Sequence, residues 1–178
     1  MAIPKTWKTC NDSEANVLFD EIIHEAENLG YRPNIRGRLM IFKHTSMYGE
    51  CRSTKIGKEY QSNIGVNQIV LTSHPALTDV LVHEIAHAIV PLDKHGLKWK
   101  EVGNCIGGKF GCDVVRARPE SFYEQYGVAI SRDDEEGKYI IECPQCHRQS
   151  KYFRKSKVVQ HPEQYQCNYC KTALVRIK

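Results

Sequence analysis

The 178-residue sequence has no apolar stretch long enough to cross a lipid bilayer, because a membrane-spanning helix needs about 20 predominantly apolar residues. The first eight residues, Met-Ala-Ile-Pro-Lys-Thr-Trp-Lys, also lack the apolar core of a secretory signal peptide. We therefore expect no membrane partner and a cytoplasmic location. Association with the nucleoid is compatible with this location.

The sequence gives little support to a disulfide framework, although it contains eight cysteines. Four of them are scattered and need no pairing: Cys10, Cys51, Cys105 and Cys112. The other four have the spacing of a metal site, described below. Because disulfides persist in oxidising compartments and are rare in the cytosol, a reducing intracellular location is the simplest interpretation.

Composition and charge describe an ordinary globular chain with an unusual C-terminal part. Hydrophobic residues make up 41% and charged residues 26%, which is typical of a soluble domain. The length allows one such domain and a small appendage. Residues 138–178 contain nine Lys or Arg and two Glu, a balance of +7, which leaves −3 of the total +4 for residues 1–137. A basic appendage on a slightly acidic body indicates contact with a polyanion.

The run Val82-His83-Glu84-Ile85-Ala86-His87 has the spacing of a hydrolytic zinc site. His83 and His87 are four residues apart, so on a helix they lie on the same face and can bind one metal ion together. Glu84 is rotated off that face, where it can take a proton from a bound water molecule. The pattern predicts a zinc-dependent hydrolase of peptide bonds.

A catalytic zinc keeps three protein ligands and one open position, and the third ligand is open to two interpretations. Pro91 ends the motif helix, and a short turn could return His95 to the metal; Glu101 could instead supply a carboxylate. The longer metalloprotease pattern, with Gly and His at fixed positions after the motif, is not met, since Val90 and Asp93 occupy those positions. We favour His95.

A helix that carries two unrelated histidines is the alternative interpretation of the motif. The surrounding helix is mostly apolar: Leu77, Val80, Leu81, Ile85, Ala88 and Ile89. Burying two imidazoles and a carboxylate among such side chains, with neither a metal nor polar partners, would be costly. We therefore prefer the metal site.

The hydrophobic periodicity predicts an α+β domain with a small antiparallel sheet beside the metal. Helices are expected over residues 13–29, 74–90 and 97–106, with a short helical turn within 121–126. Strands are expected at residues 38–42, 48–52 and 67–71. The charged stretch after residue 130 predicts three parts: a domain at 1–130, a linker at 131–138 and a second domain at 139–178.

Two Cys-x-x-Cys turns separated by twenty residues predict a structural zinc site in the second domain. They are Cys143 with Cys146, and Cys167 with Cys170. Four thiolates bind zinc tetrahedrally, and in a segment with so few apolar residues the metal supplies most of the folding free energy. A thioredoxin-like redox role is disfavoured, because there are two matched pairs and no βαβ pattern around them.

Basic and aromatic residues alternate between the two Cys-x-x-Cys turns. The candidate contacts to nucleic acid are Lys151, Tyr152, Phe153, Arg154, Lys155 and Lys157. Cations can contact phosphates, and aromatic rings can stack on unpaired bases. We expect DNA as the partner, with single-stranded and duplex forms both open; the alternative is a solvated hairpin whose charges only keep it soluble.

These motifs together resemble the SprT-like family of zinc metallopeptidases, whose best-known eukaryotic relatives are the Spartan DNA–protein crosslink proteases. The resemblance rests on the motif helix with His95-Gly96-Leu97-Lys98-Trp99-Lys100 after it, on Gly49-Glu50-Cys51-Arg52, and on the expected strand ending at Leu71. The C-terminal zinc ribbon completes a common layout of this family. Because the printed sequence ends just after the ribbon, we expect the short bacterial and bacteriophage type.

The resemblance implies a minimal zincin-like protease domain followed by a small β zinc ribbon. It implies three zinc ligands, His83, His87 and His95, with Glu84 as general base, and it implies that the four ribbon cysteines bind a second zinc. It also implies a protein substrate and, in the Spartan branch, association with DNA and repair of DNA–protein crosslinks.

The sequence thus predicts a zinc metalloprotease that acts on DNA-associated proteins and holds one catalytic and one structural zinc. The alternative is a non-catalytic DNA-binding zinc protein that acts as a scaffold or regulator. The group that would stabilise the oxyanion is left open among Tyr48, Arg52 and Tyr126. No oligomeric state follows from the sequence, and a monomer is compatible with it.

Overall fold

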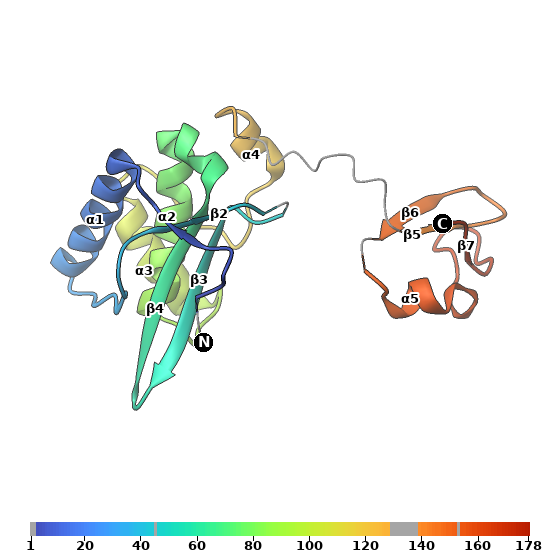
Figure 1. Ribbon diagram of the computed structural model, residues 1–178, viewed down its shortest axis with the longest axis horizontal. Helices are drawn as coiled ribbons and strands as arrows, with labels where there is room; N and C mark the ends of the chain where they lie inside the picture. The colour runs from blue at the N-terminus through green and yellow to red at the C-terminus, as the bar shows by residue number, and fades with distance from the viewer. Residues whose placement is uncertain (1–2, 45, 129–138, 153) are drawn as a thin grey trace. The chain divides into compact units, whose positions relative to one another are not determined.

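The computed structural model describes residues 3–44, 46–128, 139–152 and 154–178, and the chain divides into two compact units, Met1–Ile130 and Ser131–Lys178. Each unit has its own sheet (Figure 1). The charged segment at 131–138, expected to be a linker, lies outside the described residues. Within the described ranges, no helix is long and apolar enough to span a membrane.

Three longer helices and one short helix belong to the first unit: α1 (Ser13–Asn28), α2 (His74–Ile89), α3 (Leu97–Gly107) and α4 (Glu120–Glu124). α1 begins where the Asp12 carboxylate accepts a hydrogen bond from the Ala15 N–H at 2.9 Å, which satisfies a free amide of the first turn. α2 begins after Ser73, with a proline in its first turn. The predicted bounds of the three longer helices are closely confirmed.

The sheet of the first unit has the strand order β1-β2-β4-β3: β1 (Lys8–Thr9), β2 (Met40–Phe42), β3 (Gly49–Ile56) and β4 (Glu59–Asn67). β3 and β4 form a long antiparallel hairpin (Figure 1). β4 lies between β2 and β3, and it runs parallel to β2. The predicted α+β class is confirmed, but the sheet is mixed rather than wholly antiparallel. β3 forms one edge of it.

The strand predicted at residues 67–71 is wrong. The structure has a 3-10 helix there, η1 (Gln68–Thr72). Asn67 explains the break, because its side-chain amide donates hydrogen bonds to the carbonyls of His44 at 2.7 Å and Met47 at 2.9 Å. These bonds end β4 at this residue and turn the chain toward α2. The β-branched side chains that suggested a strand are buried or half-buried without forming one.

α2 packs on β3 and β4 and also contacts α1 and α3, so it lies at the centre of the first unit. Large, fully buried side chains come from α1, α2, α3, β4 and the segment before β2: Ile22, Leu39, Ile64, Leu81, Ile85, Trp99 and Ile106. Burying each side chain of this size stabilises the fold by about 1.5–3 kcal/mol. α2 therefore holds the side chains that it carries in fixed positions.

The second unit contains a three-stranded sheet in the order β6-β5-β7: β5 (Tyr139–Glu142), β6 (Gln149–Tyr152) and β7 (Val175–Arg176). A one-turn helix, α5 (Lys157–Gln160), and a 3-10 turn, η2 (Pro162–Gln164), precede β7. The buried hydrophobic side chains described in this unit are Ile141, Cys143, Val159 and Cys167. Such a small apolar core gives little folding free energy.

Candidate active site and metal centres

Three imidazoles converge at the C-terminal half of α2. His83 and His87 come from α2, and His95 comes from the loop between α2 and α3. His95 Nε2 lies 3.1 Å from His87 Nε2 and 3.2 Å from His83 Nε2. The potential ligand atoms of these residues all lie within 4.8 Å of one another. This group could bind a metal ion.

The protonation of this group fits a metal-ligand set. Burial, followed by the charges of the neighbouring histidines, lowers the pKa of His83 to about 3 and that of His87 to about 4. Burial and the charge of Arg116 also lower the pKa of His95. All three rings are therefore neutral at physiological pH, and neutral imidazole is the form that binds metals.

The turn that returns His95 to α2 is fixed by Asp93. The Asp93 carboxylate accepts a hydrogen bond from the Trp99 N–H at 2.7 Å, at the start of α3. Lys94 has a positive φ of 40°, and a Cβ at Gly96 would collide with the Asp93 carboxylate. Asp93, which stands where the longer metalloprotease pattern has a histidine, thus shapes the loop. Glu101 is exposed on α3 and does not belong to the three-histidine group.

Trp99 forms a common support for the three imidazoles. Its ring centroid lies 4.7 Å from that of His83, 5.2 Å from that of His87 and 4.7 Å from that of His95. The indole is 1% exposed, and its N–H donates to the His83 carbonyl at 3.4 Å. Packing against one rigid ring restricts the rotamers of all three histidines. The sequence pattern contains this tryptophan but does not indicate that role.

Glu84 is buried beside the histidines and is held by β3. The Cys51 backbone N–H donates to its carboxylate. A Cβ at Gly49 would lie 2.7 Å from Glu84 Oε1 and 2.6 Å from Val80 Cγ1, so only glycine lets β3 approach this closely. Burial raises the pKa of Glu84 to about 8, with a smaller contribution from the charge of Glu50. A cation held by the histidines would lower it again.

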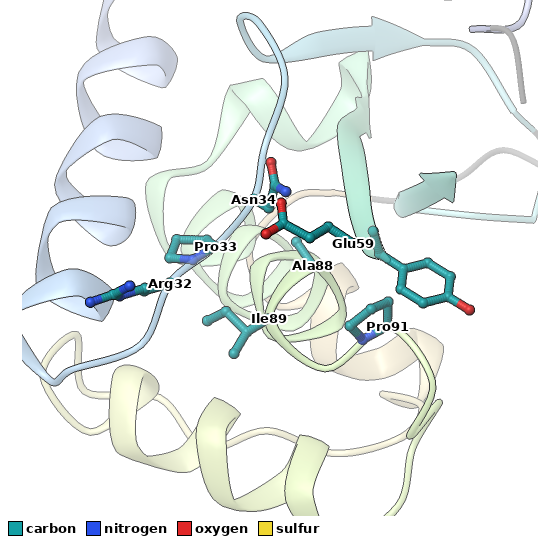
Figure 2. A pocket seen from close by; sticks show the side chains of 8 residues that line it. Arg32, Pro33, Asn34, Glu59, Ala88, Ile89 and Pro91 are labelled. Carbon is teal, nitrogen blue, oxygen red and sulfur yellow. The ribbon is translucent and has the colours of Figure 1, made fainter. Parts of the chain in front are cut away.

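These groups face one cavity of about 560 Å³. β3, α2, the His95 loop and a later segment line it with Gly49, Glu50, Cys51, Ser53, His83, Glu84, His87, Pro91, Lys94, His95 and Arg116. The edge strand β3 therefore borders the three-histidine group directly. Pro91 also lines a second cavity of about 530 Å³. Figure 2 shows Ile89 and Pro91 at the end of α2, with Asn34 and Glu59 across from them.

The three residues considered for the oxyanion are not among those lining the cavity. Tyr48 stacks on Tyr123 with ring centroids 3.8 Å apart. Arg52 pairs with Glu50 at 2.8 Å, and Tyr126 packs against the Phe122 ring. Arg116 does line the cavity, and no sequence pattern in residues 109–130 points to it.

The segment that carries Arg116 is fastened to α2 by an ion pair between the half-buried Arg118 and the buried Asp79. Arg118 Nη2 lies 2.7 Å from Asp79 Oδ1 and 2.9 Å from Asp113 Oδ1. The Tyr123 hydroxyl donates to Asp79 Oδ2 at 3.0 Å. Asp79 lies one helical turn before His83, which itself forms a hydrogen bond with the Val115 backbone. Sequence reasoning missed this network, whose partners lie up to 44 residues apart.

The second unit brings four thiols together. Cys143 Sγ lies 3.2 Å from Cys170 Sγ, and Cys146 Sγ lies 3.6 Å from Cys167 Sγ. All four sulfur atoms lie within 4.8 Å of one another. The Thr172 backbone N–H lowers the pKa of Cys170 to about 6, which favours the thiolate. This group could also bind a metal ion, and four thiolates are the donor set of structural zinc.

The predicted nucleic-acid residues of this unit are mostly accessible. Lys151, Arg154, Lys155 and Lys157 are exposed, Tyr152 is half-buried, and Phe153 lies outside the described residues. Another exposed aromatic side chain is Tyr169, which is 70% exposed. The Arg148 guanidinium lies 3.5 Å from its ring centroid. This pair offers a cation and an aromatic face on the cysteine-bearing turns.

Comparison with known proteins gives one match. The family model of the SprT-like family matches residues 19–119, more than half of the chain. The match spans most of α1, the β3–β4 hairpin, the three histidines, Glu84 and Arg116, and it ends before the four cysteines. No curated protein and no solved structure matches the chain.

Proposed function

Because the chain belongs to the SprT-like family, we propose that it is a zinc-dependent metallopeptidase that cleaves DNA-associated proteins. The observation that carries this proposal is the convergence of three neutral imidazoles in one cavity with a buried glutamate and an edge strand. A purely structural metal site has no use for an acidic side chain and an open strand edge at the same cavity.

His83, His87 and His95 are the residues that would hold the zinc. When bound there, zinc would polarise the scissile carbonyl and lower the pKa of a water molecule. Glu84 accepts a proton from the attacking water at its carboxylate and passes it to the leaving amine. The Cys51 N–H and the close approach of Gly49 keep this carboxylate in place during both transfers.

The substrate would bind as an extended chain. β3 is an edge strand that lines the cavity, and a peptide can add to such an edge through backbone hydrogen bonds that read little sequence. The second cavity, which shares Pro91 with the first and whose lining is shown in Figure 2, would give an extended substrate further room at the end of α2. This mode of binding suits unfolded segments of many proteins.

Selectivity would then come from location. Residues 138–178 carry the +7 balance, and the exposed cations of the second unit can contact phosphates. We propose that this unit is a zinc ribbon, held by its four cysteines around a structural zinc, which brings the peptidase to proteins on DNA. Repair of DNA–protein crosslinks is the cellular role that we propose for this combination.

The basic second unit also supports the alternative, a non-catalytic DNA-binding zinc protein that acts as a scaffold or regulator. Glu84 argues against it. Burying a carboxylate beside three histidines costs free energy. A scaffold gains nothing from this cost, whereas a peptidase uses the carboxylate as a general base.

The test is a cleavage assay of the zinc-loaded protein on an unfolded protein substrate, with no DNA, with single-stranded DNA and with duplex DNA. We expect turnover by the parent and a loss of about 10²- to 10⁴-fold in Glu84→Gln, with zinc content unchanged. Glu101→Gln, an exposed glutamate in the same unit, is the control. If Glu84→Gln cleaves as fast as the parent, the proposed peptidase mechanism is wrong.

A further inference from the structure

We propose that Arg116 is a catalytic residue whose guanidinium stabilises the negative charge that develops on the scissile carbonyl oxygen. The inference rests on the proposed peptidase function and names a group that no sequence motif assigns. Arg116 lines the same cavity as His83, Glu84 and His87. Its charge also reaches the imidazole of His95.

Attack of water on a peptide carbonyl places a negative charge on its oxygen, and a fixed donor aimed at this atom is among the largest contributions to catalysis. The cavity offers few such donors. Among the lining side chains that the structure describes, Glu50 and Glu84 are acids that would repel the charge, and the Ser53 hydroxyl is paired with Ser62 at 2.8 Å. Cys51 is a weak donor. Two cations remain, Lys94 and Arg116.

Arg116 is better placed than Lys94 to act as a fixed donor. Lys94 lies in the turn before His95 and is exposed, as Arg116 is, but its charge is compact and is carried on a flexible stem. Arg116 has a planar guanidinium with several donors, which suits the two lone pairs of a carbonyl oxygen. A donor stabilises the transition state most when it is already held in position, because it then needs no reorganisation during the reaction.

The backbone on both sides of Arg116 supplies that position. On one side, the Val114 N–H donates to Asn104 Oδ1 of α3 at 2.8 Å. The Val114 side chain is buried against Gly103, where a Cβ would lie 2.7 Å from it. On the other side, Arg118 is anchored to Asp79 of α2 at 2.7 Å. The Arg116 side chain lines the cavity, and Arg116 itself lies between two residues that are anchored to α3 and α2.

The test compares Arg116→Gln, Arg116→Lys and Lys94→Gln with Lys98→Gln. Lys98 is an exposed cation on α3 that does not line the cavity, so its loss matches the change in net charge. Each zinc-loaded protein is assayed for kcat and KM on one peptide. Calorimetry then measures its affinity for a phosphinic analogue of that peptide, whose charged oxygen stands in for the oxyanion. The affinity for the uncleaved peptide is measured in the Glu84→Gln background. Zinc content and Tm are recorded for every variant.

We expect Arg116→Gln to lower kcat by about 10² to 10³-fold with little change in KM. Its affinity for the phosphinic analogue should fall by a similar factor, while affinity for the uncleaved peptide stays within about threefold. Arg116→Lys should recover part of both losses because it restores the charge without the planar fork. Lys98→Gln should match the parent in all measurements.

Three results would overturn the assignment. Equal losses of affinity for the analogue and the uncleaved peptide would make Arg116 a substrate-binding residue. Loss of zinc or a large fall in Tm would make it a structural one. A larger loss in Lys94→Gln than in Arg116→Gln would transfer the role to Lys94. If the parent cleaves nothing, the proposed function fails, whereas the binding comparison still decides whether Arg116 recognises the charged oxygen.

Discussion

The two candidate metal groups have opposite surroundings. Two of the three histidines lie on α2, which is packed between the sheet and two other helices, and the third lies on the loop after it. All three pack against an indole that is 1% exposed. The four cysteines stand on turns between strands of two to four residues, in a unit with a very small apolar core. We therefore expect the first unit to fold without a metal at its histidines, and the second unit to depend on a metal at its cysteines for its fold.

This difference separates the roles that a metal can have in one chain. At the first group, the apolar core already stabilises the fold. Three histidines can therefore hold a metal and leave one coordination position open beside a buried carboxylate. At the second group, a metal held by all four cysteines would have no open position for a substrate. We expect loss of metal to cost chemistry at the first group and structure at the second.

The largest effect should follow from breaking the cysteine group. We expect Cys170→Ser to unfold residues 139–178, because a structural zinc in so small a module supplies on the order of 10 kcal/mol of folding free energy. In amide NMR spectra of the full chain, the signals of these residues should lose dispersion while those of residues 3–128 keep it. Native dispersion throughout Cys170→Ser would show that the second unit folds without its metal.

The matching change in the histidine group should leave the fold intact. His95 is an exposed loop residue, so His95→Ala should lower Tm only slightly, while it removes one zinc per chain and abolishes peptide cleavage. Elemental analysis gives the zinc content and NMR gives the fold. Glu101→Gln is the control, and it should keep both zincs and full activity. If it loses zinc while His95→Ala keeps it, the third ligand is Glu101.

An effect of intermediate size is expected on the pH dependence of stability, to which the buried carboxyl of Glu84 and the histidines contribute in opposite directions. In the folded protein freed of metal at the histidine group, the pKa of Glu84 is raised by burial to about 8. The folded state then holds a proton that the unfolded state has released, so stability falls as pH rises from 4.5 toward 8. The neutral side chain of Glu84→Gln does not have this penalty. At pH 8 the variant should be more stable than the parent, by on the order of 1 kcal/mol or more.

The measurement is denaturant unfolding of both proteins at several pH values. The histidines act in the opposite direction, since their lowered pKa values cost stability as pH falls below 6.5. Comparing the variant with the parent between pH 6.5 and 8 isolates Glu84. Parallel stability curves for the two proteins over this interval would contradict a raised pKa at Glu84.

The sequence predicts those parts of the fold whose signals are local. The helix with His83, Glu84 and His87 follows from a four-residue spacing and apolar periodicity, and the cysteine turns follow from Cys-x-x-Cys. His95 is favoured because Pro91 ends the helix and leaves a short loop. These inferences need no knowledge of distant contacts.

The sequence fails where a contact joins distant residues or one side chain overrides a propensity. Asn67 ends β4 through side-chain hydrogen bonds to a loop 20 and 23 residues earlier in the chain. The apolar run after it becomes η1 instead of the predicted strand. Arg118 reaches Asp79 across 39 residues, so the placement of Arg116 in the cavity has no local signal. Trp99 and Asp93 are visible in the sequence, but their contacts with the histidines and the loop are not.

The smallest effect joins the two units through DNA. We expect cleavage of a DNA-bound protein to be about tenfold faster than cleavage of the same protein free, and the advantage should shrink as salt rises from 50 to 200 mM, roughly the range over which phosphate contacts weaken strongly. Replacing Lys151, Arg154, Lys155 and Lys157 together by Gln should remove it.

The control for this change is a short peptide, which the quadruple variant should cleave at the rate of the parent, because the four residues belong to the second unit and the cavity is lined by residues of the first. A slower rate on the peptide would mean that the variant has damaged the peptidase itself. If DNA alters neither rate nor binding even at low salt, the second unit is a structural or protein-docking module. The +7 balance would then serve solubility or a protein partner, and location on DNA would not explain the selectivity of an edge strand that reads little sequence.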